Sequence, residues 1–452
     1  MSAQVDIDNI IKIYLEKLSA GGSGVNELEV RFGTRGIKRT TRINYDNIIQ
    51  KLLSAGFVFE KTSEHSLKMR PEFTDIKGQT KESNVRAEIM GLSNIENYCK
   101  TNDLSTIHHS LIQKGSIEHK GAYVKPVNVD DFNFRITLSN EQEIRSGSGM
   151  GKNIVDSWNE AKKSFRLMNR VSLIHATLPF RIDLSIVKES RRRGYGYVLE
   201  YTMQDSGVLD ASENYEIEIE VVNEKIMPDI NAKLLANNLR KTIKYVLSGF
   251  QETNYPISYK EMRSIARDYL TLIYGKADSD KLYNNQFIGP SSYTLQLPNI
   301  VPVNPDMASP NIRNNYTVTE KADGMRKILF INETGTIVLM DTNMNIQGTG
   351  VKCHNKELFN TIIDGEHILH NKKGDFINLY AAFDIYFLNK KNIRSFGFAP
   401  LSTSDNDKSF RLPLLHAAIK KMKLKSYGGS DSNLPIRIEY KNFKIANEKQ
   451  SI

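Results

Sequence analysis

The chain has 452 residues, of which 40% are hydrophobic and 25% are charged, and its formal net charge is +9. This composition excludes a disordered chain, and no apolar run is long enough to span a bilayer, so we expect a globular protein of two or three domains with no membrane partner. The two cysteines lie far apart without metal-ligand spacing, which indicates a reducing compartment and excludes a disulfide framework. The positive charge favours an anionic partner.

Hydrophobic periodicity predicts the elements in chain order. Residues 1 to about 20 form an amphipathic helix. From 24 to about 222, alternation predicts many strands, interrupted by helices near 44–55 and 92–102 and by a glycine-rich hairpin loop at 146–153. A helix covers 230–253. Another follows Pro256, where Ser258 and Glu261 have capping-box spacing. Residues 276–315 are irregular, strands resume at Tyr316, and a last strand covers 436–440.

Acidic strands stand at both ends of the first region. Alternation places Glu27, Glu29 and Arg31 on one face of a strand, and Glu216, Glu218 and Glu220 on one face of another. Like charges about 7 Å apart repel each other, so a cation must compensate them. A carboxylate-bound divalent metal is one solution. Facing arginines are the other.

Basic strands lie between the acidic ones. Alternation places Arg135 on the polar face of one strand, and Arg166 and Arg170 on the polar face of a second. On a third strand, Arg181 and Asp183 share the polar face. If the apolar faces pack against flanking helices, the charged faces line a central cavity. We therefore predict a closed antiparallel barrel with a polar interior.

This combination resembles the triphosphate tunnel metalloenzymes, in particular metal-dependent RNA triphosphatases. The resemblance covers residues 24–225 and implies a Mg²⁺ or Mn²⁺ site. Its metal ligands would be Glu27, Glu29, Glu218 and Glu220, and its triphosphate-binding residues Arg135, Arg166, Arg170 and Arg181. Glu216 would instead hold a basic neighbour, and Asp183 and Glu200 are candidates for orienting water. Lys163 and Lys188 are the nearest matches to the lysines of such tunnels.

A lysine tract, residues 316–326, predicts a strand that delivers Lys321 into a turn formed with Asp323 and Gly324. With tracts 362–366 and 382–386, it resembles the mRNA guanylyltransferase and polynucleotide ligase superfamily. The resemblance implies that Lys321 is the catalytic nucleophile, and that a nearby divalent metal and Arg326 or Lys327 would help to release its proton. Asp323, Gly324, Arg326, Glu366 and Phe383 would bind the nucleotide, and Asp384 would support its strand.

Together the two resemblances point to an mRNA-capping enzyme of the large DNA virus type. The expected fold is α+β: a tunnel barrel at 1–228, a helical connector at 229–276, and an ATP-grasp-like nucleotidyltransferase domain at 277–452. Because the later superfamily motifs are missing, we expect this domain to be C-terminally incomplete, and guanylyl transfer to be weak. The implied substrates are 5′-triphosphate RNA and GTP, and the implied location is the host cytoplasm or the virion. RNA polymerase and a methyltransferase domain or subunit are further expected partners.

Three alternatives stay open. The lysine domain could belong to an ATP-dependent RNA or DNA ligase, although a ligase has no use for triphosphate hydrolysis. The barrel could act on polyphosphate or free nucleoside triphosphates. The second domain could serve binding alone. The basic run 191–193 favours a solvated turn, with a tunnel mouth that attracts RNA phosphates as the alternative.

Overall fold

The computed structural model describes residues 2–22, 24–34, 39–74, 77–194, 196–226, 230–303, 310–313, 316–400, 407–427 and 434–445. The chain divides into two compact units, Met1–Phe250 and Gln251–Ile452. No helix among these described residues is long and apolar enough to cross a membrane.

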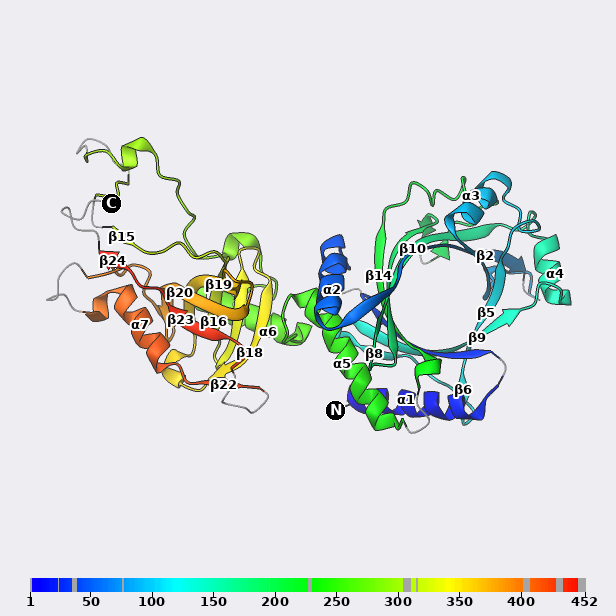
Figure 1. Cartoon of the computed structure of the whole chain (residues 1–452), viewed down its shortest axis with the longest axis horizontal. Coiled ribbons are helices and arrows are strands. Elements are labelled where there is room, and N and C mark those ends of the chain that lie inside the picture. The colour runs from blue at the N-terminus through cyan, green and yellow to red at the C-terminus, as the bar shows by residue number, and fades with distance from the viewer. Residues whose placement is uncertain are drawn as a thin grey trace. The chain divides into compact units, whose positions relative to one another are not determined.

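The first unit is built around a closed antiparallel barrel, seen end-on as a ring in Figure 1. Its strands follow one another in the order β1, β14, β11, β10, β2, β4, β5 and β9, and β9 pairs back with β1. Their bounds are β1 Val25–Phe32, β2 Phe57–Thr74, β4 Val85–Met90, β5 Ser110–Ser116, β9 Phe134–Ile144, β10 Lys163–His175, β11 Phe180–Glu189 and β14 Asn214–Val221. The predicted closed barrel is therefore confirmed.

Helices cover the outside of the barrel (Figure 1). They pack there because the apolar side chains of the strands point outward. One core joins β1, β9, β11 and β14 to α1 Ser2–Ala20, α2 Arg42–Ser54 and α5 Ala232–Gln251. A second core joins β2, β4 and β5 to α3 Leu92–Thr101 and to Trp158. With their apolar side chains used in these cores, the strands turn their charged faces inward.

Shorter elements decorate the barrel: β3 Thr80–Glu82, β6 Glu118–His119, β7 Ala122–Tyr123, β8 Val127–Val129, β12 Arg192–Arg193, β13 Gly196–Tyr197 and α4 Gly149–Asp156. The prediction of a hairpin loop at 146–153 was wrong in its second half, because α4 begins there. The Ser148 side chain caps it by accepting from the Gly151 N–H at 3.2 Å.

The second unit contains a mixed sheet in the order β21, β20, β19, β16, β17, β18 and β22, with β23 parallel to β20. Helix α6 Tyr259–Tyr274 packs on one face and α7 Arg411–Lys421 on the other. The strands are β16 Met325–Ile331, β17 Thr336–Asp341, β18 Ile346–Cys353, β19 Thr361–His370, β20 Phe376–Leu388, β21 Lys391–Asn392, β22 Leu424–Ser426 and β23 Arg437–Tyr440. Ser258 caps α6 through the Glu261 N–H at 3.1 Å, as its spacing predicts.

The strand expected to carry Lys321 is much shorter than predicted. Only Thr317–Val318 (β15) pairs, with Lys444–Ile445 (β24), so the ladder ends three residues before the lysine. Lys321 lies in an irregular segment that leads into β16. The two connector helices belong to different cores, α5 to that of the first unit and α6 to that of the second.

Candidate functional site

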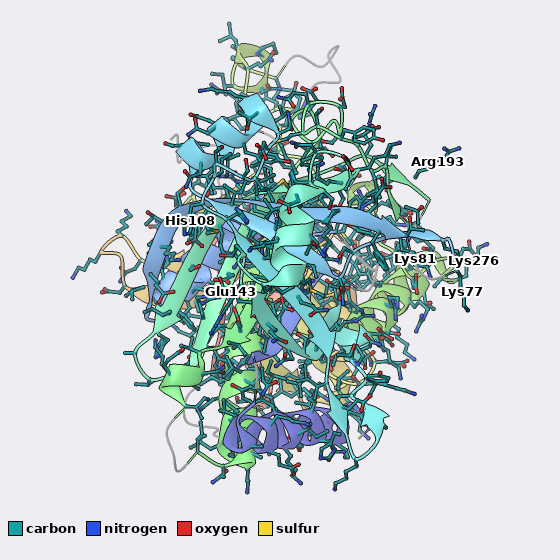
Figure 2. The ribbon with its side chains drawn as sticks, turned by 90° about the vertical axis from the view of Figure 1, so that its right-hand side faces the viewer. Lys77, Lys81, His108, Glu143, Arg193 and Lys276 are labelled. Carbon is teal, nitrogen blue, oxygen red and sulfur yellow. The ribbon has the colours of Figure 1, made fainter. Side chains whose placement is uncertain are left out.

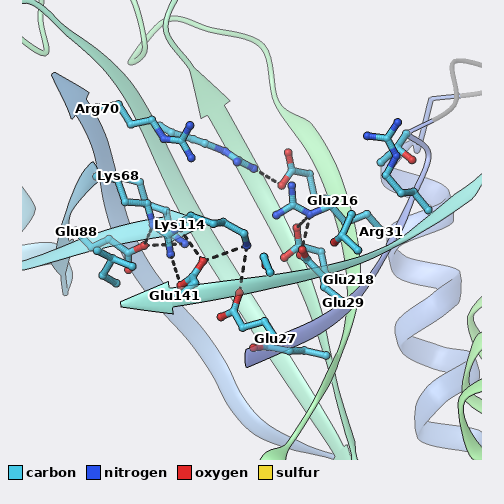
Figure 3. Close-up of a pocket in the computed structure, with 18 of the residues that line it drawn as sticks. Glu27, Glu29, Arg31, Lys68, Arg70, Glu88, Lys114, Glu141, Glu216 and Glu218 are labelled. Carbon is cyan, nitrogen blue, oxygen red and sulfur yellow. Dashed lines mark hydrogen bonds and ion pairs between the residues drawn. The ribbon is translucent and has the colours of Figure 1, made fainter. Parts of the chain in front are cut away.

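The barrel encloses a cavity of about 840 Å³ that is lined mainly by charged side chains (Figure 3). Among the described residues that line it, ten are Lys or Arg and nine are Glu. These charged residues face the cavity because alternate residues of a strand point to the same side. The cavity therefore has an interior of paired charges rather than an apolar core.

The four predicted metal ligands line this cavity on two neighbouring strands. Glu29 lies opposite Glu220 in the β1–β14 ladder, and Arg31 lies opposite Glu218. Arg31 Nε is 2.7 Å from Glu29 Oε1 and 2.9 Å from Glu218 Oε1, so one guanidinium bridges two carboxylates. Glu27 is paired 3.1 Å from Lys114 Nζ, and Glu220 is paired with Arg181.

These carboxylates have unequal acidities. Burial, together with Glu141 and Glu220, raises the pKa of Glu27 to about 7, although Lys114 opposes the shift. Burial likewise raises the pKa of Glu29 and Glu220. Burial would also raise the pKa of Glu218, but Arg31 and Arg170 outweigh it and hold the pKa at about 2. The raised pKa values thus come first from the loss of water around the carboxylates, and Glu218 keeps its charge because two arginines lie beside it.

The four predicted triphosphate arginines also line the cavity. Arg166 pairs with Glu216 and lies 3.4 Å from Glu189. Arg170 Nη1 and Arg181 Nε are each 3.0 Å from the buried carboxylate of Asp183. Arg135 Nε donates to Asn128 at 2.8 Å.

The two candidates for orienting water lie outside the lining. Asp183 is buried behind the arginines and accepts from Ser172 Oγ at 2.7 Å. Glu200 pairs in a β-bridge with Lys163 and approaches Arg191 at 3.7 Å. Neither side chain is among those that line the cavity.

Sequence reasoning missed the basic residues of β2, β4 and β5: Lys68, Arg70, Arg86 and Lys114 line the cavity. The signal was present, because Lys68 and Arg70 alternate with the buried Leu67 and Met69. Lys163, predicted as the nearest match to a tunnel lysine, is instead buried outside the cavity. Its Nζ donates to the Trp158 and Ala161 carbonyls at 2.7 and 2.6 Å.

The donor chemistry of the acidic cluster fits a hard divalent cation, since glutamate oxygens are the ligands that Mg²⁺ and Mn²⁺ take. Within the described part of the chain, however, no three potential ligands are gathered around one point. Arg31, Arg181 and Lys114 hold the carboxylates apart. A bound metal would have to replace some of these ion pairs.

In the second unit, three of the predicted nucleotide-binding residues, Arg326, Glu366 and Phe383, lie on the neighbouring strands β16, β19 and β20. Arg326 and Glu366 are register partners on β16 and β19. The guanidinium of Arg326 binds the buried Asp364, with Nε 3.2 Å from Oδ1, and lies over the rings of Phe287 and Phe383 at 5.2 and 5.7 Å. The aromatic contact of Phe287 had no sequence signal.

Lys321 is exposed, together with Asp323 and Gly324. Lys327 was predicted to help release the proton of Lys321. It is buried, and its side chain points to the opposite face of the strand from that of Arg326. Its Nζ lies 2.5 Å from Gln347 Oε1 and 3.0 Å from His367 Nδ1. Asp384 is held by Arg411, with Nε 2.8 Å from Oδ1, which ties β20 to α7.

Residues 295–452 match the family model described as mRNA capping enzyme, catalytic domain. A probable mRNA-capping enzyme of Acanthamoeba polyphaga mimivirus is 26% identical over 352 residues, which cover 73% of this chain and 26% of that relative. The chain thus spans about a quarter of the length of this relative.

Two solved structures are similar to about half of the chain. The mimivirus capping enzyme triphosphatase covers 53% of this chain and 95% of its own, with 16% identity and a TM-score of 0.33. The S. pombe Pct1 RNA triphosphatase covers 53% and 91%, with 14% identity and a TM-score of 0.31.

Proposed function

The chain resembles the mRNA-capping enzymes of large DNA viruses, as its motifs predicted, and on this premise we propose that it acts on the 5′ end of RNA. The barrel removes the γ-phosphate of 5′-triphosphate RNA. The second unit carries GMP from GTP on Lys321 toward the resulting diphosphate end. The single observation that supports the first step most is the barrel cavity, where a carboxylate cluster and a set of arginines face each other.

In the proposed hydrolysis, Arg135, Arg166, Arg170 and Arg181 hold phosphate oxygens, for which planar guanidinium groups are suited. Glu27, Glu29, Glu218 and Glu220 would hold Mg²⁺ or Mn²⁺, and such an ion would supply Lewis-acid polarisation of the γ-phosphate and a bound water. The water oxygen bonds to the γ-phosphorus, and the bond from that phosphorus to the β–γ bridging oxygen breaks. Diphosphate-ended RNA and inorganic phosphate leave.

In the proposed transfer, Lys321 Nζ attacks the α-phosphorus of GTP, and pyrophosphate leaves. Free lysine has a pKa of about 10.4, so the ammonium must lose its proton first. Arg326 and Glu366 contact the sugar or phosphates, Phe383 stacks on the base, and Asp323 and Gly324 shape the approach to Lys321. Because Arg326 is held by Asp364 in this structure, nucleotide binding has to share or replace that contact.

The first activity is tested by γ-phosphate release from 5′-triphosphate RNA with Mg²⁺ or Mn²⁺. Glu29→Ala and Glu220→Ala should each lower kcat/KM by several orders of magnitude, as loss of a metal ligand implies. Glu143→Ala is the matched control, because Glu143 is an exposed carboxylate of β9 outside the cavity lining. Activity that survives both cavity substitutions would refute the assignment of the metal ligands.

The second activity is tested by covalent labelling with radioactive GTP or ATP. Labelling by GTP that is lost in Lys321→Ala and kept in Lys276→Ala, an exposed lysine of the same unit, supports guanylyl transfer. Preferential labelling by ATP would favour a ligase. Absence of labelling with either nucleotide would favour a binding role for the second unit.

A further inference from the structure

The two ends of the barrel cavity differ in charge. Toward one end, where β1 starts and β14 finishes, lie Glu27 and Glu220. Toward the other end, where β1 finishes and β9 starts, lie Arg31 and Arg135, which are register partners. RNA is a polyanion, so this second end is the more favourable entrance.

The register of β11, β10 and β2 places two more basic residues, Arg166 and Arg70, toward this end, where β11 finishes. The last residue of β11, Glu189, is the register partner of Arg166, and Arg70 is paired with Ser164 two positions further along. Arg70 and Arg135 line the cavity without a carboxylate partner among the described residues. Both cations are therefore available to phosphate.

A two-stranded hairpin stands directly after β11 at this entrance. Arg192 of β12 and Tyr197 of β13 are register partners, and both line the cavity. The guanidinium carbon of Arg192 lies 4.6 Å from the centre of the Tyr197 ring, so the two flat groups form a stack. The Arg192 side chain remains 57% exposed.

The hairpin is fixed to the barrel through Glu189. Tyr197 Oη donates to Glu189 Oε1 at 2.7 Å, and Arg192 Nη2 lies 2.9 Å from Glu189 Oε2. Glu189 also approaches Arg166, which in turn pairs with Glu216. A continuous chain of polar contacts thus runs from the hairpin to the predicted triphosphate arginines.

We propose that Arg192 and Tyr197 form a stacking platform for the first nucleotide of the RNA. This inference rests on the proposed triphosphatase function. Aromatic rings and guanidinium planes bind unpaired RNA bases by stacking, without sequence preference. The platform holds the nucleoside at the entrance while its triphosphate extends along the arginines toward the carboxylate cluster.

The carboxylate cluster and the hairpin are linked along the barrel by adjoining contacts. Glu218 and Glu216 are two residues apart on β14, about 7 Å, and Arg166 joins Glu216 to Glu189, which holds the platform. Glu218 shares Arg31 with Glu29. From Glu218, one step along β14 reaches Glu216, and a second step through Arg166 reaches Glu189 and the hairpin.

The test compares two substrates, 5′-triphosphate RNA and inorganic tripolyphosphate, which has no base. Tyr197→Ala should raise KM for the RNA by about five- to 150-fold, which corresponds to the roughly 1–3 kcal/mol that stacking contributes per base, and leave kcat and tripolyphosphate hydrolysis unchanged. Tyr197→Phe keeps the ring and should retain most of the RNA affinity. Arg193→Ala is the matched control: Arg193 is exposed at the outer edge of Figure 2 and lies outside the cavity lining.

The outcomes separate this inference from the function on which it rests. A wild-type protein that hydrolyses neither substrate overturns the proposed triphosphatase itself. If the wild type hydrolyses both, an unchanged KM for RNA in Tyr197→Ala, or an equal change for both substrates, overturns the stacking platform alone. Fluorescence of the buried Trp158, the single tryptophan of the chain, verifies that each variant keeps the fold of the first unit.

Discussion

Loss of Arg86 should destabilise the first unit strongly. Its guanidinium faces Glu141 with two parallel contacts of 2.9 Å, and both side chains are largely buried, with 11% and 14% exposed. Burial would raise the pKa of Glu141, but Arg86 and Lys114 outweigh it and hold the pKa at about 2, below its ordinary value of 4.5. This carboxylate therefore contributes stability above pH 4.5 that is lost as the pH falls toward 2.

The size of the effect follows from two independent arguments. The difference between the two pKa values corresponds to about 3 kcal/mol at pH 7. Removing one partner of a buried ion pair typically costs about 3–5 kcal/mol, because the other charge stays buried. Arg86→Met should therefore lower the free energy of unfolding of the first unit by about 3 kcal/mol or more at pH 7.

The measurement is urea unfolding followed by Trp158 fluorescence, which reports on the first unit because Trp158 lies in its core. A double-mutant cycle with Glu141→Gln isolates the pair from the other contacts of Arg86. Arg42→Met is the control, since its pair with Asp46 at 3.1 Å is exposed and should contribute less than about 1 kcal/mol. A coupling energy between Arg86 and Glu141 no larger than that of the exposed pair would refute the reasoning.

Three further predictions follow from the same structure. Mg²⁺ affinity, measured by calorimetry, should rise as the pH increases from 6 to 8, because the raised pKa of Glu27, about 7, makes a proton compete with the metal; a flat profile would exclude Glu27 as a ligand. Burial and Lys327 lower the pKa of His367 from 6.5 to about 4, so its neutral form contributes stability that is lost as the pH falls from 6.5 toward 4. The loss is about 2 kcal/mol by pH 5. His367→Gln should remove this acid sensitivity from the thermal unfolding of the second unit. Gly350→Ala should destabilise that unit by more than about 1 kcal/mol, since Gly350 has φ +78° and an added Cβ would lie 2.4 Å from the Tyr255 ring, whereas the open, exposed Gly147→Ala should change little.

The barrel was predictable because one physical rule, alternation of apolar and charged residues, acts on each of its strands. Glu29 and Glu220 could be assigned to one cavity since both acidic strands carry the same pattern. Lys68 and Arg70 were missed although they obey that rule, because no carboxylate run of the kind on β1 and β14 marks their strand. Asp183 alternates correctly as well, yet its side chain lies behind the arginines, and only their positions reveal this.

The second unit was harder to predict because its key contacts come from distant segments. Arg326 lies between Phe287 and Phe383, which are far from it in sequence, and no local pattern joins them. Lys327 follows Arg326 directly, and a strand turns it to the opposite face, where it is buried beside His367. The short ladder of β15 depends on β24, more than a hundred residues later.

Arg31 bridges Glu29 and Glu218. This bridge couples the binding of the proposed triphosphate to that of the proposed divalent cation, because each ligand would take one side of the ion pairs. A phosphate group that draws the guanidinium away releases two carboxylates at once, and a cation bound by those carboxylates releases the guanidinium. Each ligand thus prepares the cavity for the other. If the two ligands exchange with this Arg31 bridge in that way, thermodynamic reciprocity requires that triphosphate and divalent cation strengthen each other's binding by the same factor.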